Sequence, residues 1–344
     1  MSERLKVPLA PMEALHVAEI PTGSQWQYEP KWDGFRCLAF RRGNNIQLQS
    51  KSGQLLTRYF PEVVGQLLAL KAKQFVLDGE IVIANRGRLS FNDLLMRIHP
   101  AKSRVEKLAR ETPAFLIVFD LLEDENTGSL IKLPLQSRRL RLEAFAKRQF
   151  SKAPRIALSP VTLDVKQARR WFGTAGGNLD GIVAKRRDLE YRSGDRTGMV
   201  KIKPVRTADC VVGGFRYATG KRLVGSLLLG LYNDAGFTAS LKRTELRDLT
   251  KKLVALIQPP GFTGKAPGGP SRWSTKRSTE WQPLKTKLVV EVECDHFTGG
   301  RFRHGTKLVR WRPDKAPQQC RIDQIAVGGQ GALELVTRLK SRAH

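Results

Sequence analysis

The chain has 344 residues, 41% of them apolar, and a net charge of +28 from 60 Lys and Arg against 32 Asp and Glu residues. The length predicts two domains, and the charge predicts an anionic partner. Nucleic acid fits better than a membrane surface, because the sequence has no lipidation signal, no amphipathic basic helix and no run of about 18 apolar residues. We therefore expect no membrane association.

Residues 1–25 are expected to form a loose lead-in, because Pro8, Pro11 and Pro21 disfavour regular structure. After it, runs rich in Val, Ile and Phe alternate with helical patterns. The expected strands are 35–42 and 46–50, joined as a hairpin by the turn at 43–45, then 74–84 and 115–122. The expected helices are 61–70, 91–98 and 135–150. Since regular β-α-β alternation is missing, the region to residue 204 is predicted to be a mixed unit built on antiparallel sheets.

The pattern changes after residue 204. Strand-like runs at 208–218, 223–233 and 236–242 precede a helix at 245–257, a Pro/Gly-rich stretch at 259–270, and strands at 287–297 and 306–312. About five short strands with one helix, in a basic region, predict a small β-barrel of the oligonucleotide-binding type. The chain is therefore predicted to be of the α+β class, with domains at 1–205 and 206–344.

The four cysteines, Cys37, Cys210, Cys294 and Cys320, are scattered without a Cys-x-x-Cys pair, which is typical of free thiols in a reducing cytoplasm. Cys294 lies two residues before His296 in an expected strand. With no second pair nearby, both are predicted to be packing residues and not zinc ligands. The start of the chain shows no signal peptide, so a cytoplasmic protein is expected.

Phosphate-binding loops of the Gly-x-x-x-x-Gly-Lys-Ser/Thr and Gly-x-Gly-x-x-Gly kinds are absent from the sequence. Phosphate chemistry must then depend on side chains, and the segment EPKWDGFR at 29–36 is the strongest candidate. It places Lys31 before the Asp33-Gly34 turn, with Arg36 five residues on. A lysine must be neutral to attack phosphorus, and neighbouring cations and partial desolvation favour the neutral amine. The alternative is a surface lysine before an ordinary turn.

Further polar residues interrupt the apolar runs downstream. They are Asp78-Gly79-Glu80, Phe119-Asp120, Asp180-Gly181 followed by Lys185, and Lys201 with Lys203. Lys201 and Lys203 alternate along an expected strand and would present two ammonium groups to phosphate on one face. Glu80 and Asp180, carboxylates beside glycines, suit oxygen ligation of Mg²⁺ or Mn²⁺. Each has a structural alternative, namely strand-end turns, edge lysines and a core aromatic at Phe119.

Taken in order, EPKWDGFR, FVLDGEIV, FLIVFDLL, LDGIVAKR and MVKIKP resemble the motif series of the covalent nucleotidyltransferases: ATP-dependent DNA ligases, RNA ligases and mRNA-capping enzymes. LVRWRPDKAP at 308–317 is similar to the C-terminal motif of DNA ligases and capping enzymes. The resemblance covers about residues 25–325, and the short chain is most similar to the small bacterial type C DNA ligases. It implies an adenylation (nucleotidyltransferase) domain, an oligonucleotide-binding-fold domain that binds DNA, and ATP-dependent sealing of nicks.

The resemblance also implies roles for individual residues. Lys31 would be the adenylated nucleophile, Glu29 the reader of adenine and Phe119 the ring stacked on the base. Arg36 and Glu80 would contact ribose or metal, and Lys201 and Lys203 the α-phosphate. Asp33, Glu80 and Asp180 would lie at Mg²⁺ or Mn²⁺. Lys51 would contact nucleotide or nick phosphate, and the leaving pyrophosphate would be oriented by Arg310, Arg312, Asp314 and Lys315.

Two positions depart from the family pattern. Asp180 stands where Glu is usual, which shortens a candidate metal ligand by one methylene. Lys51 stands where Arg is common, and lysine offers a point charge in place of a bidentate fork. The alternatives are an RNA ligase, a capping-type guanylyltransferase that uses GTP, and an inactive DNA-binding protein that kept the fold. Asp180 is the feature that favours the inactive protein.

The expected partner is nicked duplex DNA, and repair or end-joining proteins are further candidates. Residues 204–207 would serve as a hinge. We expect a monomer in the bacterial cytoplasm, associated with the nucleoid. The residues expected to follow DNA phosphates are Arg216, Lys221, Arg222, Lys242 and Arg243.

Overall fold

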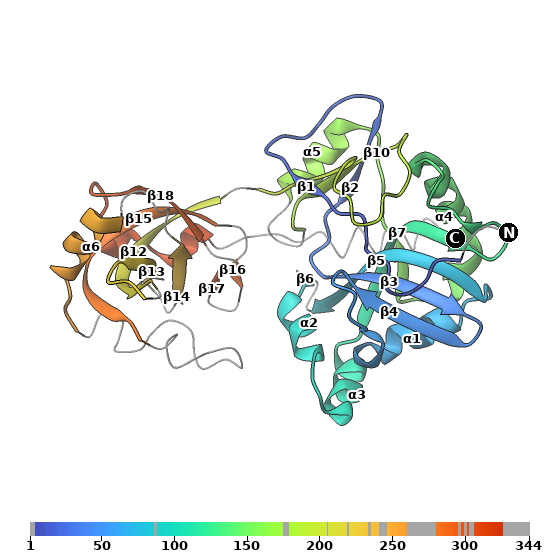
Figure 1. Cartoon of the computed structure of the whole chain (residues 1–344), viewed down its shortest axis with the longest axis horizontal. Coiled ribbons are helices and arrows are strands. Elements are labelled where there is room, and N and C mark those ends of the chain that lie inside the picture. The colour runs from blue at the N-terminus through green and yellow to red at the C-terminus, as the bar shows by residue number, and fades with distance from the viewer. Residues whose placement is uncertain are drawn as a thin grey trace. The chain divides into compact units, whose positions relative to one another are not determined.

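The computed structural model describes residues 4–325 except 86–87, 175–178, 205, 219, 233–234, 241–245, 260–279, 295–296, 299–300 and 303–305. These residues form two compact units, 4–204 and 206–325, each with its own apolar core (Figure 1). Within this described part, no helix is long and apolar enough to cross a membrane. His296, Lys242, Arg243 and most of the Pro/Gly-rich stretch lie outside the described residues.

The larger sheet of the first unit confirms the predicted hairpin and the two long strands. Its order is β4-β3-β5-β7-β8, with β6 on β5 and β9 on β7. The strands are β3 (Phe35–Arg42), β4 (Asn45–Ser50), β5 (Gln74–Asn85), β6 (Arg88–Leu89), β7 (Ala114–Asp124), β8 (Gly128–Ser129) and β9 (Ile156–Leu158). All pairings are antiparallel except β7 with β9.

The two faces of this sheet differ in polarity. Because side chains alternate along a strand, Phe35 and Cys37 enter the main apolar core while Arg36 lies on the opposite face. The same rule places Leu77 and Ile81 in that core and leaves Glu80 on the face of Arg36. The second face is therefore where the polar residues of β3 and β5 meet.

A smaller sheet has the order β1-β11-β10-β2. Its strands are β1 (Leu15–His16), β2 (Trp26–Pro30), β10 (Ile182–Arg186) and β11 (Met199–Ile202). β1 pairs in parallel with β11, so the segment predicted to be a loose lead-in contains a short strand that only a distant partner stabilises. One face of this sheet packs against α5 through Tyr28, Ile182 and Ile202.

The helices of the first unit cover the sheets (Figure 1). They are α1 (Pro61–Leu68), α2 (Phe91–Arg97), α3 (Lys102–Glu111), α4 (Leu135–Gln149) and α5 (Val165–Gly173), with 3₁₀ turns at Thr57–Tyr59 and Phe150–Lys152. The predictions of α1, α2 and α4 are confirmed to within two residues. α3 and α5 were not predicted, although Asp164 caps α5 by accepting from the Lys166 amide at 2.8 Å.

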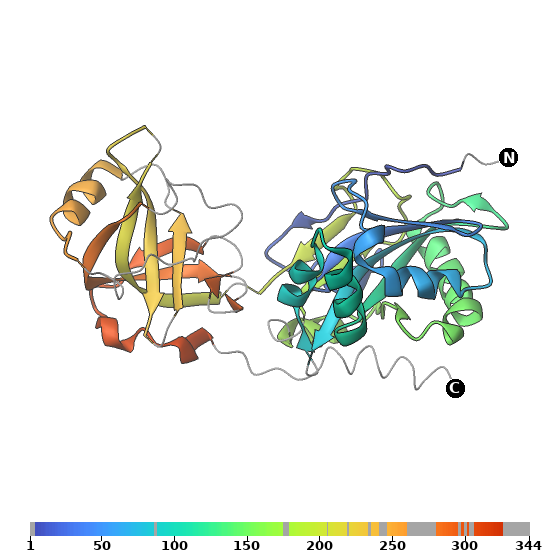
Figure 2. The same ribbon diagram turned by 90° about the horizontal axis from the view of Figure 1, so that it is seen from below.

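The second unit confirms the predicted barrel. Its closed order is β12-β13-β14-β18-β15, with strands β12 (Arg206–Tyr217), β13 (Val224–Leu231), β14 (Ala235–Ser240), β15 (Gln282–Cys294) and β18 (Thr306–Trp311). Helix α6 (Leu246–Val254) lies beside the strands of the barrel (Figure 2). Its Leu249 and Leu253 pack on the barrel core. The described residues of this unit also form the β16–β17 pair (Phe297–Thr298 and Arg301–Phe302) and two 3₁₀ turns, η4 (Pro317–Gln319) and η5 (Ile322–Ile325).

Candidate active site

Lys31 lies directly after β2, where two backbone hydrogen bonds fix it to the neighbouring strand. Its amide donates to the carbonyl of Gly181 at 3.0 Å, and its carbonyl accepts from the amide of Asp180 at 2.9 Å. Gly181 has φ +125°, and a Cβ there would lie 2.0 Å from the Ile202 carbonyl oxygen. Glycine is therefore required where β10 begins beside β11.

The Asp33-Gly34 turn follows at once and brings the chain across β5. A Cβ at Gly34 would lie 2.2 Å from the carbonyl oxygen of Ile81. This close approach explains why a glycine is needed at position 34. The short motif around Lys31 thus encodes a backbone path that a larger residue at Gly34 would block.

A pocket of about 860 Å³ lies between the polar faces of the two sheets of the first unit. This volume is ordinary for a site that binds a small ligand or cofactor. Seven of the predicted site residues line it, namely Glu29, Lys31, Arg36, Lys51, Glu80, Phe119 and Lys201. Pro11 to Ala14 of the lead-in form part of its wall, which sequence reasoning missed.

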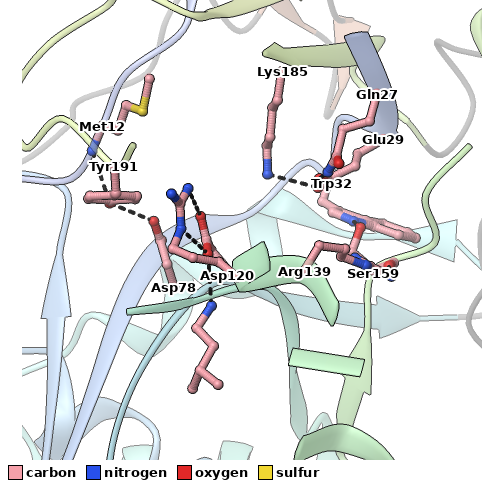
Figure 3. A network of polar contacts seen from close by, with 12 residues as sticks. Met12, Gln27, Glu29, Trp32, Asp78, Asp120, Arg139, Ser159, Lys185 and Tyr191 are labelled. Carbon is pink, nitrogen blue, oxygen red and sulfur yellow. Dashed lines mark hydrogen bonds and ion pairs between the residues drawn. The ribbon is translucent and has the colours of Figure 1, made fainter. Parts of the chain in front are cut away.

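Glu29 is held at one part of this pocket by two donors. The Lys185 ammonium lies 2.9 Å from its Oε2, and the Gln27 amide nitrogen lies 3.1 Å from its Oε1 (Figure 3). Glu29 is 2% exposed and Lys185 8%, so this is a buried ion pair. The sequence motif contains Lys185 but did not predict a role for it. Strand alternation could have found it, because Val183 and Lys185 both lie on the face opposite to Ile182 and Ala184.

Phe119 lies at a β-bulge. The register passes from Asp78 opposite Asp120 to Gly79 opposite Val118, so Phe119 has no partner on β5. The Arg36 guanidinium carbon lies 4.6 Å, and the Lys185 Nζ 4.3 Å, from its ring centroid. Two cations thus share the ring that lines the pocket.

A buried hydrogen-bond network holds Arg36 in place. Its Nε and one terminal nitrogen donate to the two oxygens of Asp78 at 2.5 and 2.6 Å. Tyr191 donates to Asp78 at 2.7 Å and accepts from the Met12 amide at 3.0 Å (Figure 3). Asp78 and Tyr191 therefore fix the orientation of the arginine that was predicted to contact ribose.

Glu80 is a carboxylate of this pocket, and its proton binding is strongly perturbed. Burial raises the pKa of Glu80 to about 7, against the lowering effect of the charges of Lys31 and Arg36. Among the described residues, no three His, Cys, Asp or Glu side chains gather closely enough to enclose a metal ion. A magnesium ion needs only one or two carboxylates when phosphates supply the other oxygens, so Glu80 fits such a role.

Lys31 and Lys203 converge on Asp180. The Asp180 Oδ2 lies 2.5 Å from the Lys31 ammonium and 3.0 Å from that of Lys203. Lys203 lies one residue past β11 and does not line the pocket, whereas Lys201 does. Burial, and then the charges of Lys31 and Lys203, lower the pKa of the Lys201 ammonium. Two lysines thus contact one carboxylate, and Lys201 lies near enough to be affected by their charges. This arrangement suits an anionic group that carries more than one charge.

Lys51 lies on the other side of the pocket and pairs with an acid from the lead-in. Its ammonium lies 3.0 Å from Glu13, which also contacts Arg196 at 3.0 Å. The hydrogen bond from Lys51 lowers the pKa of Glu13. The lysine that replaces the usual arginine thus has a local carboxylate partner.

The predicted residues of the C-terminal motif belong to the second unit. Arg310 pairs with Glu291 at 2.6 Å, and Lys315 with Asp209 at 2.6 Å. Arg312 contacts both Asp209 and Asp314, at 2.9 and 2.8 Å. Each predicted cation of this segment is therefore paired with a carboxylate of its own unit.

Comparison with known proteins agrees with this architecture. The family described as ATP dependent DNA ligase domain matches residues 11–203, and the one described as ATP dependent DNA ligase C terminal region matches residues 220–315. DNA ligase C2 of Mycolicibacterium smegmatis and DNA ligase C of Mycobacterium tuberculosis are each 40% identical to this chain, covering 92% of it and 94% of each relative. A solved structure from a study of Lig E DNA ligases covers 88% of this chain and 100% of its own at 16% identity, with a TM-score of 0.57, and supports the fold.

A lysine that lines a nucleotide-sized pocket beside other lysines, in a chain whose second unit is a closed β-barrel, is the arrangement of a nucleotidyltransferase of the ligase type. The chain belongs to the ATP-dependent DNA ligase family. It is an enzyme that joins DNA and uses ATP, and the resemblance found in the sequence is confirmed.

Proposed function

We propose that the enzyme seals nicks in duplex DNA through a lysyl-AMP intermediate on Lys31. The observation that carries this proposal is the position of Lys31, which lines the nucleotide-sized pocket and contacts the Asp180 cluster through its ammonium group. An amine at this point can reach the α-phosphorus of a nucleotide whose base occupies the pocket. The lysine cluster would bind the phosphate oxygens.

In the first step, a bond forms between the Lys31 Nζ and the α-phosphorus of ATP. The bond from that phosphorus to the bridging oxygen breaks, and the electron pair leaves with pyrophosphate. Lys31 must lose a proton first, and Asp180, 2.5 Å away, is placed to receive it. Lys201 neutralises charge on the α-phosphate, and Arg310, Arg312 and Lys315 neutralise the pyrophosphate.

In the second step, an oxygen of the 5′-phosphate at the nick attacks the same phosphorus and the bond to Lys31 breaks. In the third, the 3′-hydroxyl attacks the 5′-phosphate, which forms the phosphodiester and releases AMP. Mg²⁺ or Mn²⁺ held at Glu80, with Asp33 nearby, would supply positive charge for the phosphate oxygens. Asp180 remains a candidate third ligand, although its present partners are the ammonium groups of Lys31 and Lys203.

Base selection follows from the pair of Glu29 and Lys185. The Glu29 carboxylate, which Lys185 contacts at 2.9 Å, accepts hydrogen bonds and donates none, so it favours the amino group of adenine over the carbonyl oxygen of guanine. Arg36, fixed by Asp78, would contact the ribose, and Lys51 would contact a phosphate. This chemistry supports ATP as the nucleotide over GTP.

Repair or end joining is the proposed setting. The multifunctional non-homologous end joining protein LigD of Mycobacterium bovis is 30% identical over 327 residues, and this chain covers 39% of it. End-joining proteins are therefore the proposed partners, with a monomeric enzyme acting near the nucleoid. The exposed Lys221 and Arg222, together with Arg216, would contact DNA phosphates. The proposed domains are 1–205 and 206–344, and residues 204–207 would provide the hinge between them.

The test uses labelled ATP and GTP, a nicked DNA duplex, and its RNA counterpart. Wild type should form an acid-labile protein–AMP adduct with ATP but not GTP, and should seal the DNA nick. Lys31→Ala should abolish both, whereas Lys166→Ala, which changes an exposed lysine at the start of α5, should leave both intact. Sealing with ATP by the Lys31 variant would refute the proposed intermediate.

A further inference from the structure

The cationic segment, by which we mean residues 310–315 with Arg310, Arg312 and Lys315, is anchored to the barrel by the carboxylate of Asp209. Both oxygens of Asp209 accept from a terminal nitrogen of Arg312, at 2.9 and 3.1 Å, and one also accepts from the Lys315 ammonium at 2.6 Å. Asp209 lies on β12, about a hundred residues before these partners in sequence. It is 9% exposed, so its charge is largely removed from water and depends on Arg312 and Lys315 for compensation.

The backbone of Asp209 is held as tightly as its side chain. The Gln324 side chain accepts from the Asp209 amide at 2.9 Å and donates to its carbonyl at 2.8 Å. Gln324 belongs to η5, which follows the cationic segment in the chain. Asp209 on β12 therefore anchors the cationic segment through Arg312 and Lys315. It also anchors the turn that follows the segment, through Gln324.

Strand register adds a second carboxylate beside the first. Asp209 on β12 lies opposite Glu291 on β15, and Glu291 lies opposite Arg310 on β18. Directly opposed residues present their side chains on the same face, so the two acids stand in one row across the barrel. The Glu291 Oε2 lies 2.6 Å from the Arg310 Nε, but the side chain of Arg310 is 64% exposed. This outer pair is weak compared with the buried contacts of Asp209.

These contacts determine how Arg312 is presented. One terminal nitrogen of Arg312 contacts Asp209, while its Nε and other terminal nitrogen contact Asp314, at 3.0 and 2.8 Å. A guanidinium held by two carboxylates has a fixed plane, and Lys315 keeps two of its three N–H donors after one contacts Asp209. Prearranged cations bind an anion with a smaller loss of side-chain entropy than free ones.

We propose that Asp209 is a positioning residue for the first step of ligation, because it holds Arg312 and Lys315 in the arrangement that receives the leaving pyrophosphate. This inference rests on the proposed lysyl-AMP mechanism and assigns Asp209 no contact with substrate. Only enzyme adenylation and its reversal involve pyrophosphate. Asp209 therefore contributes to these two reactions and not to phosphodiester formation at a nick that already carries AMP.

The experiment compares wild type with Asp209→Asn and Asp209→Glu in three assays: lysyl-AMP formation from ATP, release of AMP from the adduct by added pyrophosphate, and sealing of a pre-adenylated nick. Asp209→Asn should slow adenylation at least tenfold and raise the KM for pyrophosphate in the reverse reaction, while sealing of the pre-adenylated nick changes less than twofold. Asp209→Glu, which keeps the charge, should recover part of the adenylation rate. The control Asp323→Asn removes an exposed carboxylate 3.7 Å from Arg321 in the same unit and should change none of the three.

Equal slowing of adenylation and sealing, together with a lower Tm, would show that Asp209 only supports the fold and would overturn the inference. Unchanged or faster adenylation in Asp209→Asn would overturn it as well. Failure of the wild type to form a protein–AMP adduct would instead refute the proposed function. The two failures are therefore distinguishable in one set of measurements.

Discussion

The buried pair of Lys185 and Glu29 provides the sharpest test of how the pocket is held together. Lys185→Met keeps most of the length of the side chain and removes its charge. Glu29, 2% exposed, would then retain the single neutral donor Gln27 at 3.1 Å. Removing one partner of a buried ion pair costs about 3–5 kcal/mol, because the other charge stays desolvated. With an m-value of roughly 2–3 kcal/mol per molar urea, the unfolding midpoint should fall by about 1–2 M.

The assay is urea unfolding at pH 7, followed by the fluorescence of buried tryptophans such as Trp32. The double variant Glu29→Gln/Lys185→Met should be more stable than Lys185→Met alone. Lys132→Met, which removes an exposed lysine 3.5 Å from Glu190, is the control and should have little effect. Losses that simply add in the double variant would refute the reasoning.

Three further predictions concern proton binding, backbone geometry and DNA. Because burial raises the pKa of Glu80 to about 7 and its ionised form is the one that binds cations, kcat/KM for adenylation should increase as the pH rises through about 7, and Glu80→Gln should remove that inflection. Gly181→Ala should lower the free energy of unfolding by at least about 2 kcal/mol, since its Cβ would meet a backbone oxygen at 2.0 Å. Gly65→Ala, exposed in α1 with open space around it, should raise the free energy of unfolding by up to about 1 kcal/mol, and thermal melts measure both changes. Affinity for nicked DNA should fall steeply with salt, roughly a thousandfold between about 50 and 200 mM for about six phosphate contacts, and a flat titration would count against phosphate binding.

Local patterns in the sequence predicted much of the fold. Alternating apolar residues located β3, β4, β5 and β7, and the run from Pro61 located α1, because these elements bury one face against a nearby partner. The pattern failed where a distant segment decides the structure. β1 has two residues and exists because β11 pairs with it, and α3 has one fully buried side chain, Val105, too little for an apolar stripe.

The candidate site shows the same limit. The ordered motifs located Lys31, Glu29 and Glu80, which line one pocket. They could not show that Phe119 occupies a bulge, since a bulge depends on the register of β5 against β7. Nor could they show Asp209, because its importance comes from partners about a hundred residues away that the barrel brings beside it.

The pairing of β1 with β11 also bears on the order in which the chain folds. Leu15 lies opposite Val200, and β2 pairs with β10 across a similar separation, so the wall of the pocket joins the two ends of its unit. Contacts between residues this far apart in sequence form late, because a long loop must close before they bring any stabilisation. During synthesis, β1 and β2 leave the ribosome about 150 to 185 residues ahead of their partners. We therefore expect an incomplete chain to bind no nucleotide, so that ATP is captured only after the whole first unit has been made.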